Sequence, residues 1–241
     1  KEDHAGVKAA TIEVKKVEGA TQYVLKLPSS VLTAAEPDRR IKIETPLGSI
    51  TAPSNMMTQD VIGNSSNVEL SIGLADRSGI SEDLKAVIGD RPLIELSVRV
   101  EGKTIVWNNP EAPVTISVDY TPTAEELKDP EHIVVWYIDG NGKAISVPSG
   151  RYDPTSGKIT FTTTHFSKYA VAYVQKTFDD IDEYGWAKRE IEVLASKGII
   201  EGTSDTTYEP GKFITRADFL VLLVKGLGLT AKIDSNFSDV S

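Results

Sequence analysis

Apolar and polar residues alternate in short runs along the first 175 residues, the pattern of β-strands with one buried face. Turn-forming sequences separate the runs, for example Thr45–Gly48 and Asp139–Gly142, where glycine supplies the backbone angles of tight turns. This spacing predicts a mainly β fold of one or two β-sandwiches, with a possible split near residues 108–113. The expected strands are Thr11–Val17, Gln22–Leu27, Arg40–Glu44, Val68–Gly73, Leu93–Val100, Val114–Tyr120, His132–Ile138, Lys158–Thr163 and Tyr169–Val174.

Two stretches have helical spacing instead. Ile80–Ile88 predicts a short helix, which we expect to cross between sheets. From Thr177 onward the apolar period lies between three and four residues, and Gly198 follows the first stripe in the usual position of a helix-ending glycine. A second helix is predicted from Thr215, where Asp218 forms an aspartate version of the capping box, to Gly226 or Gly228. The first stripe consists of Ala187, Ile191, Leu194 and Ala195.

Composition narrows the classes of function. The chain has 26 Lys and Arg residues and 35 Asp and Glu residues. The resulting net charge of −9 argues against nucleic-acid binding and against a basic membrane anchor. The absence of cysteine excludes disulfides and cysteine-based sites. No apolar run approaches the ~18 residues of a membrane span. The sequence opens without Met, so we expect it to be a piece of a longer protein.

Motifs for chemistry on an external substrate are missing from the sequence. It has no paired carboxylates, P-loop, nucleophile elbow or dinucleotide-binding turn, so we expect neither such an enzyme nor a cofactor. The acidic run Asp179–Glu183 lacks the spacing of a calcium loop, and His4 and His132 are isolated, so we expect no metal site. Trp107, Trp136 and Tyr137 are an alternative candidate, as a stacking platform for sugar.

The region after Thr177 carries a series of short motifs, and they resemble an S-layer homology (SLH) repeat. The family usually has glutamate where this chain has Asp218. A second copy of the opening motif, one repeat further on, is rarely accidental. The resemblance implies an SLH repeat at 177–236 and the start of another at 237–241. The motifs are Phe178-Asp179-Asp180-Ile181, Trp186-Ala187, Leu194–Gly202, Tyr208-Glu209-Pro210, Ile214–Asp218 and, as the second opening, Phe237-Ser238-Asp239-Val240.

The SLH resemblance implies an extracellular protein of the bacterial cell envelope. Such repeats, normally three in tandem, hold exported proteins on secondary cell-wall polysaccharide, in grooves between neighbouring repeats. By motif position, Arg216 meets the anionic sugar and Trp186 lines the groove, while Gly202 and Asp180 shape it. A guanidinium fork suits a carboxylate or pyruvyl ketal. Neighbouring repeats are therefore the other expected partners, and the β region is a spacer or presenting module. The alternative is that Trp186 is a core residue and Arg216 an ordinary surface residue.

The β region resembles the sandwich segments that precede SLH repeats in Gram-positive surface proteins, on residues 133–137, 150–154 and 160–171. More weakly, His165-Phe166-Ser167 resembles the site at which PIDD-type sandwich domains cleave their own chain.

That second resemblance implies cleavage between Phe166 and Ser167 by an N→O acyl shift. The Ser167 hydroxyl attacks the preceding carbonyl, and His165 accepts its proton. On a strand, His165 and Ser167 share a face about 7 Å apart, and a kink at Phe166 would bring them together. The alternative is that the tripeptide is an ordinary strand segment.

Overall fold

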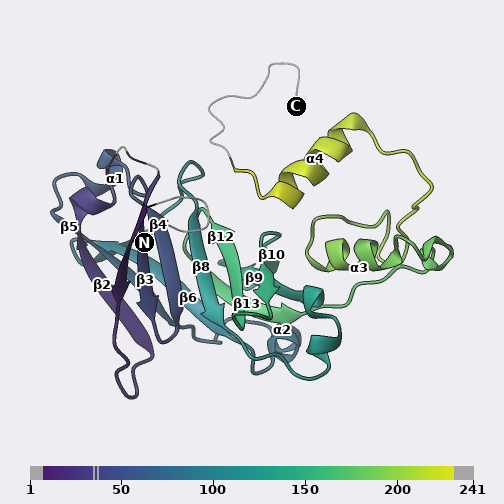
Figure 1. Ribbon diagram of the computed structural model, residues 1–241, viewed down its shortest axis with the longest axis horizontal. Helices are drawn as coiled ribbons and strands as arrows, with labels where there is room; N and C mark the ends of the chain where they lie inside the picture. Colours follow the sequence, from purple (N-terminus) through teal and green to yellow (C-terminus); the bar gives the residue numbers. More distant parts are fainter. Residues whose placement is uncertain (1–7, 35, 37, 231–241) are drawn as a thin grey trace.

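The computed structural model describes residues 8–34, 36 and 38–230, so His4 and the second opening motif at Phe237–Val240 lie outside the described residues. The strands form two sheets, and the two longest helices lie in the region after residue 177 (Figure 1). The predicted fold class, mainly β followed by a small helical part, is confirmed.

One sheet has six strands and the other has seven. The six-stranded sheet has the order β1 (Lys8–Glu13), β3 (Arg39–Thr45), β4 (Gly48–Pro53), β8 (Val114–Asp119), β12 (Lys158–Thr163) and β11 (Arg151–Asp153). The seven-stranded sheet has the order β10 (Ala144–Ser146), β9 (Ile133–Ile138), β13 (Lys168–Tyr173), β6 (Leu93–Val100), β5 (Asn67–Leu74) and β2 (Gln22–Pro28), and β7 (Lys103–Ile105) pairs with β6. The α-helices are α1 (Gln59–Ile62), α2 (Glu82–Ile88), α3 (Lys188–Ser196) and α4 (Arg216–Leu227), and the 3-10 turns are η1 (Ser29–Val31), η2 (Glu126–Lys128), η3 (Pro130–His132) and η4 (Asp182–Tyr184).

The two sheets pack face to face around one hydrophobic core. Side chains alternate between the two faces of a strand, so every second residue points inward. Ile50 of β4 and Ile116 of β8 are opposite each other in register and both are buried. Ile72 of β5 and Val98 of β6 belong to the same core from the other sheet. The alternating pattern of the sequence is therefore the inward face of a sandwich.

Strands from both sides of residues 108–113 lie side by side in each sheet. In the six-stranded sheet β4 pairs with β8, and in the seven-stranded sheet β6 pairs with β13. The shared core contains residues from both halves of the chain as well. The β strands therefore form one sandwich, and the split that the sequence left open does not occur at that point.

Helix α2 does not cross between sheets, contrary to the expectation for Ile80–Ile88. It joins β5 to β6, which are antiparallel neighbours in the seven-stranded sheet. Ile80 and Ile88 pack on Leu93, Ile138 and Ala170, so the helix covers part of the outer face of that sheet. An apolar stripe shows that a helix is buried on one side, but it does not specify the surface on which the helix packs.

A buried ion pair fixes the segment that leads into β9. The Glu126 carboxylate, 1% exposed, accepts hydrogen bonds from Arg91 Nε at 2.7 Å, Tyr120 Oη at 2.7 Å and the Thr123 amide at 2.7 Å. Arg91 Nη2 lies 2.6 Å from the same carboxylate. Burial acts to raise the pKa of Glu126, but the bonds from Thr123, Tyr120 and Arg91 outweigh it, and the pKa is lowered.

The helical region has a small core of its own, built from Phe178, Ile181, Ile191, Ala195, Ile199 and Ile200. The predicted stripe of the first helix is thus confirmed by α3, which Gly198 follows with a φ of 68°. In α4 the predicted capping box is also present: Thr215 Oγ1 accepts from the Asp218 amide at 3.1 Å, and the Asp218 carboxylate accepts from the Thr215 amide at 3.2 Å.

Polar contacts join α3 to the sandwich. His132, on η3 and 3% exposed, places Nδ1 2.8 Å from the Val174 carbonyl oxygen and 3.0 Å from Ser196 Oγ of α3. Arg189 of α3 pairs with Asp129 at 2.9 Å and with Glu131 at 2.7 Å. His132 is therefore part of the junction between the two regions.

Candidate functional site

The helical region has a groove of about 530 Å³ between α4 and the loop that precedes it. Charged and aromatic side chains mix along its walls. Two lysines approach glutamates there: Lys212 lies 2.9 Å from Glu209, and Lys225 lies 3.6 Å from Glu201. The lining residues include Ile199, Ile200, Glu201, Tyr208, Glu209, Lys212, Phe213, Ile214, Asp218 and Lys225.

Asp180 holds the loop that forms one wall of this groove. Its Oδ1 accepts from the Tyr208 amide at 2.9 Å and its Oδ2 from the Glu209 amide at 2.7 Å. These backbone bonds, that of Tyr208 first, lower the pKa of the Asp180 carboxyl group. Glu209 has a φ of 60°, a conformation that the two bonds help to hold. Asp180 acts on the shape of the loop.

Gly202 occupies a position with no room for a side chain. A Cβ there would lie 2.4 Å from Phe178 Cε1 and 2.5 Å from the carbonyl oxygens of Ser204 and Thr207. The chain therefore turns tightly beside the small core, and Gly202 also shapes the loop.

Trp186 and Arg216 lie at the surface, outside the residues that line the groove. The Trp186 side chain is 85% exposed, so the alternative in which it belongs to the core is wrong. Arg216 is exposed at the first position of α4, directly after its cap Thr215. Its guanidinium adds to the positive end of the helix dipole, which favours an anion there. Arg216 makes no ion pair with any residue in the described ranges.

Sequence reasoning missed the groove itself. Lys212, Lys225, Tyr208 and Phe213 line it, yet none was singled out as a binding residue. A signal was present for Lys212 and Phe213, because they stand between the Pro210-Gly211 turn and the helix cap at Thr215. Residues between a turn and a capped helix lie on a loop, where binding residues concentrate.

His165-Phe166-Ser167 lies between two strands, so the alternative of an ordinary strand segment is wrong, although His165 forms a single β-bridge with Asn108. β12 ends at Thr163 and β13 starts at Lys168, so the tripeptide connects one sheet to the other. Phe166 packs edge-on against Trp107, with ring centroids 4.9 Å apart. The shared strand face that would have aligned His165 with Ser167 is therefore absent from this connection.

The two polar side chains of the tripeptide face different surroundings. Ser167 Oγ donates to the Ile138 carbonyl oxygen at 3.0 Å and lines a pocket with Ile138 and Lys168. The His165 ring packs against Tyr137, with centroids 4.7 Å apart, and lines another pocket with Pro148. Burial lowers the pKa of His165, which favours the neutral imidazole, but its Nε2 has no hydrogen-bond partner. No hydrogen bond joins the His165 imidazole to the Ser167 hydroxyl group in the described part of the chain.

The aromatic platform considered for sugar is not assembled. Trp107 is 3% exposed, and its Nε1 donates to the Met56 carbonyl oxygen at 3.0 Å, so it belongs to the core. Trp136 and Tyr137 are half-buried neighbours on β9, and neighbouring residues of a strand point to opposite faces. In the described part of the chain, no three His, Asp or Glu side chains come close enough to hold a metal ion.

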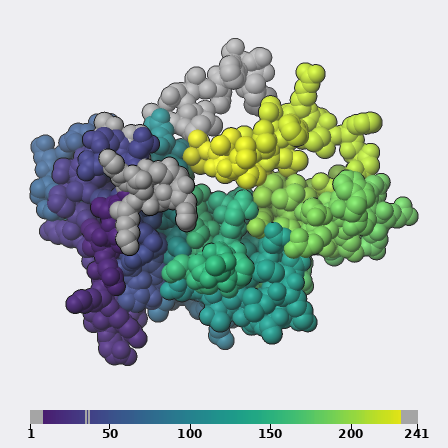
Figure 2. Space-filling view, in the orientation of Figure 1, coloured from purple at the N-terminus to yellow at the C-terminus, as the bar shows by residue number. Residues whose placement is uncertain are grey.

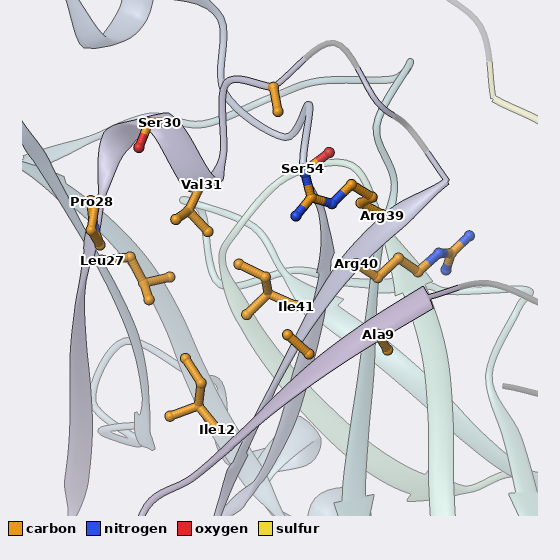
Figure 3. A pocket seen from close by; sticks show the side chains of 12 residues that line it. Ala9, Ile12, Leu27, Pro28, Ser30, Val31, Arg39, Arg40, Ile41 and Ser54 are labelled. Atoms are coloured by element: carbon orange, nitrogen blue, oxygen red, sulfur yellow. The ribbon is translucent and has the colours of Figure 1, made fainter. Parts of the chain in front are cut away.

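A second cavity, of about 630 Å³, lies at the open edge of the sandwich between β1, β2 and β3. Figure 3 shows Ile12, Leu27, Val31 and Ile41 pointing into it, while the Arg40 guanidinium points away. Its aliphatic lining offers few partners for sugar hydroxyl groups, so it is a poorer candidate for a polysaccharide than the groove beside α4.

Comparison with known proteins identifies the helical region. Residues 177–220 match the family model of the S-layer homology domain. The chain is similar over 235 residues, at 29% identity, to an amylopullulanase of Thermoanaerobacterium thermosulfurigenes, covering 97% of this chain and 12% of the relative.

Two further relatives align with less of the chain. An endo-1,4-beta-xylanase A of Thermoanaerobacterium saccharolyticum is 48% identical over 110 residues, covering 43% of this chain and 9% of the relative. Exoglucanase XynX of Acetivibrio thermocellus is 40% identical over 109 residues, covering 42% of this chain and 10% of the relative. The chain thus spans about a tenth of the length of these relatives.

The S-layer homology domain is a module for attachment to the cell wall, so this match indicates a location at the cell envelope. None of the helices in the described ranges has the length and apolar character that a membrane crossing requires.

Proposed function

We propose that residues 177–220, an S-layer homology domain, attach the protein to secondary cell-wall polysaccharide, and that the sandwich is the spacer between this anchor and the rest of the protein. The family match carries the proposal. The surface of the domain supports it, because Arg216 is exposed at the positive end of α4 and Trp186 is exposed on the same domain.

Arg216 is the proposed anion-binding residue of the polysaccharide site. A guanidinium donates two parallel hydrogen bonds to a carboxylate, which fixes an acidic sugar in one orientation. Trp186 offers a flat apolar ring for the face of a sugar. Asp180 and Gly202 keep the loop in shape and do not contact the ligand in this proposal.

We propose neighbouring repeats as the other partners, because α4 is left largely uncovered. Phe213 before the helix is 99% exposed, and Leu220 and Val221 within it are 58% and 51% exposed. Only Leu222 of α4 packs against the core of the helical region. Figure 2 shows the yellow α4 segment on the surface of the molecule. A helix with apolar residues all round is normally buried, and further helical repeats are the natural cover.

The test of attachment is co-sedimentation with wall sacculi, in their native form and after extraction of their secondary polysaccharide. Replacing Arg216 by alanine removes a bidentate charge-assisted bond and weakens binding at least about tenfold, a loss of about 1.4 kcal/mol or more. Arg216→Lys restores only part of it. The matched control is Arg99→Ala, which removes an exposed arginine from β6 of the sandwich.

Equal binding of the Arg216→Ala and Arg99→Ala variants to native sacculi would contradict the assigned role of Arg216. Binding that survives extraction of the polysaccharide would contradict the ligand. A protein that includes the following repeats gives the sharper measurement, because grooves between repeats are then complete.

A further inference from the structure

The outward-facing side chains of the six-stranded sheet form two rows that run across its strands. Neighbouring strands lie about 4.8 Å apart, and side chains two residues apart on one strand lie about 7 Å apart. Most members of the rows are serine or threonine, so the face presents a regular array of hydroxyl groups. The register places Glu13, Glu44, Ser49, Ser117 and Thr160 in one row, and Thr11, Lys42, Thr51, Thr115 and Thr162 in the other.

These hydroxyl groups are available to a ligand. Thr51 and Thr115 are partly exposed, and their hydroxyl groups bond to no other residue in the described ranges. Thr160 donates to Ser117 Oγ at 3.1 Å, which leaves the second lone pair of Ser117 and the acceptor sites of Thr160 unused. The face is also hollowed, with a volume of about 700 Å³ over β3, β4, β8 and β12.

Lysines surround the hollow, although the chain as a whole is acidic. Lys15, Lys16, Lys42 and Lys158 line it, against the two glutamates Glu13 and Glu44, in a chain of net charge −9. Lys42 pairs with Glu44 at 2.5 Å, and Lys158 pairs with Asp119 at 2.5 Å. The side chains of both ion pairs are at least 39% exposed. Exposed pairs contribute little to stability, so these ammonium groups are able to exchange their partners for the acidic groups of a ligand.

We infer that this outer face of the six-stranded sheet is a second binding surface, and that its ligand is an acidic polysaccharide. Hydroxyl rows match the closely spaced hydroxyls of a sugar chain, and the lysines match carboxylate or phosphate groups on it. No aromatic residue is among those lining the hollow, so hydrogen bonds and charge hold the ligand. The outer face of the other sheet differs, because α2 packs on it with apolar residues.

The inference goes beyond attachment through the helical domain, since it assigns a binding role to the sandwich. Polygalacturonate, a polymer of a uronic acid, is the acidic probe, and dextran is the neutral one. Affinity electrophoresis of the whole chain gives the dissociation constants. The double variant Lys42→Gln and Lys158→Gln removes two charges from the face, and the matched control is Lys26→Gln with Lys103→Gln, which removes two exposed lysines from the seven-stranded sheet.

The expected result is binding of polygalacturonate in preference to dextran. The Lys42 and Lys158 double variant weakens it at least about tenfold, through loss of charge-assisted hydrogen bonds, and the control double variant leaves it within about twofold. Thr51→Val with Thr115→Val keeps the shape and every charge, and weakens binding of polygalacturonate through the loss of two hydroxyl groups.

Three outcomes overturn the inference: no binding of polygalacturonate, an equal effect of the two lysine double variants, or no effect of the threonine variants. Arg216→Ala separates this site from the helical domain. If that variant alone abolishes binding of polygalacturonate, the sandwich face is not the site. If the protein does not bind sacculi but its binding of polygalacturonate still depends on Lys42 and Lys158, attachment through the helical domain is wrong and the second surface stands.

Discussion

Replacing Glu126 by glutamine tests whether the buried ion pair sets the stability of the sandwich. The carboxylate accepts bonds from Arg91, Tyr120 and the Thr123 amide at once. A glutamine amide has one acceptor oxygen. If that oxygen faces Arg91, its NH₂ group meets the Thr123 N–H, and two donors then point at each other.

The expected loss of stability is about 2–3 kcal/mol. Removing one partner of a buried ion pair costs about 3–5 kcal/mol, and glutamine recovers one or two neutral bonds worth about 1 kcal/mol each. Urea unfolding followed by circular dichroism measures the loss, as a midpoint lowered by about 1 M for a slope of about 2–3 kcal/mol/M.

The matched control is Glu125→Gln on the preceding residue, whose pair with Lys128 is 71% exposed on both sides. Its effect stays within about 1 kcal/mol. Equal midpoints for the two variants would refute the reasoning, because the buried and exposed pairs would then be equivalent.

The same cluster predicts how stability depends on pH. The pKa of Glu126 is lowered below its ordinary 4.5, so its stabilisation is complete above about pH 4.5 and is lost as the pH falls through the folded-state pKa. Burial, followed by the bond to Glu126, raises the pKa of Tyr120 to about 12. The protonated Tyr120 hydroxyl group therefore stabilises the folded state fully below pH 10, and this stabilisation is lost between pH 10 and 12. Tyr120→Phe removes the alkaline loss, and an unchanged alkaline limb contradicts the assignment.

Three further predictions follow from local geometry. Gly202→Ala destabilises the helical region by about 1–3 kcal/mol, because the added Cβ has no room. The control Gly185→Ala has nothing within 4 Å of its added Cβ and leaves stability unchanged. Thermal melts of the two variants measure the difference. Intact-mass spectra of the wild type and of Ser167→Ala each show one full-length chain, since Ser167 bonds to a carbonyl oxygen, and fragments 1–166 and 167–241 in the wild type alone would establish self-cleavage. His132→Gln loosens the junction and speeds tryptic cleavage after Lys176 roughly tenfold, and an unchanged rate shows that the contacts of His132 do not hold the junction.

The sandwich and the first helix of the helical domain could be predicted because their signal is local and periodic. Alternation placed Ile41 and Ile43 on one face of the predicted strand Arg40–Glu44, and the stripe through Ile191 and Ala195 gave the buried side of α3. The capping box of α4 was predicted from two residues, Thr215 and Asp218, since its hydrogen bonds close within one turn.

The remaining features depend on contacts between distant residues. The packing of α2 on Ala170 joins segments that are far apart in the sequence, and no periodicity encodes it. The tripeptide at Phe166 has the composition of a strand, yet it leaves the sheet, where Phe166 packs on Trp107. The groove beside α4 was missed for the same reason, because Tyr208 and Lys225 meet only in three dimensions.

The position of β13 has a mechanical consequence for a protein held on a wall. β13 is the strand that leads toward the helical domain, and it is paired on both sides, with β9 and β6. β1 is an edge strand and has one ladder, a parallel one of six residue pairs to β3. Tension along the chain is therefore resisted by two ladders at the end near the anchor and by one at the far end. Under load the sandwich yields first at β1, while the strand that connects to the anchor keeps its place.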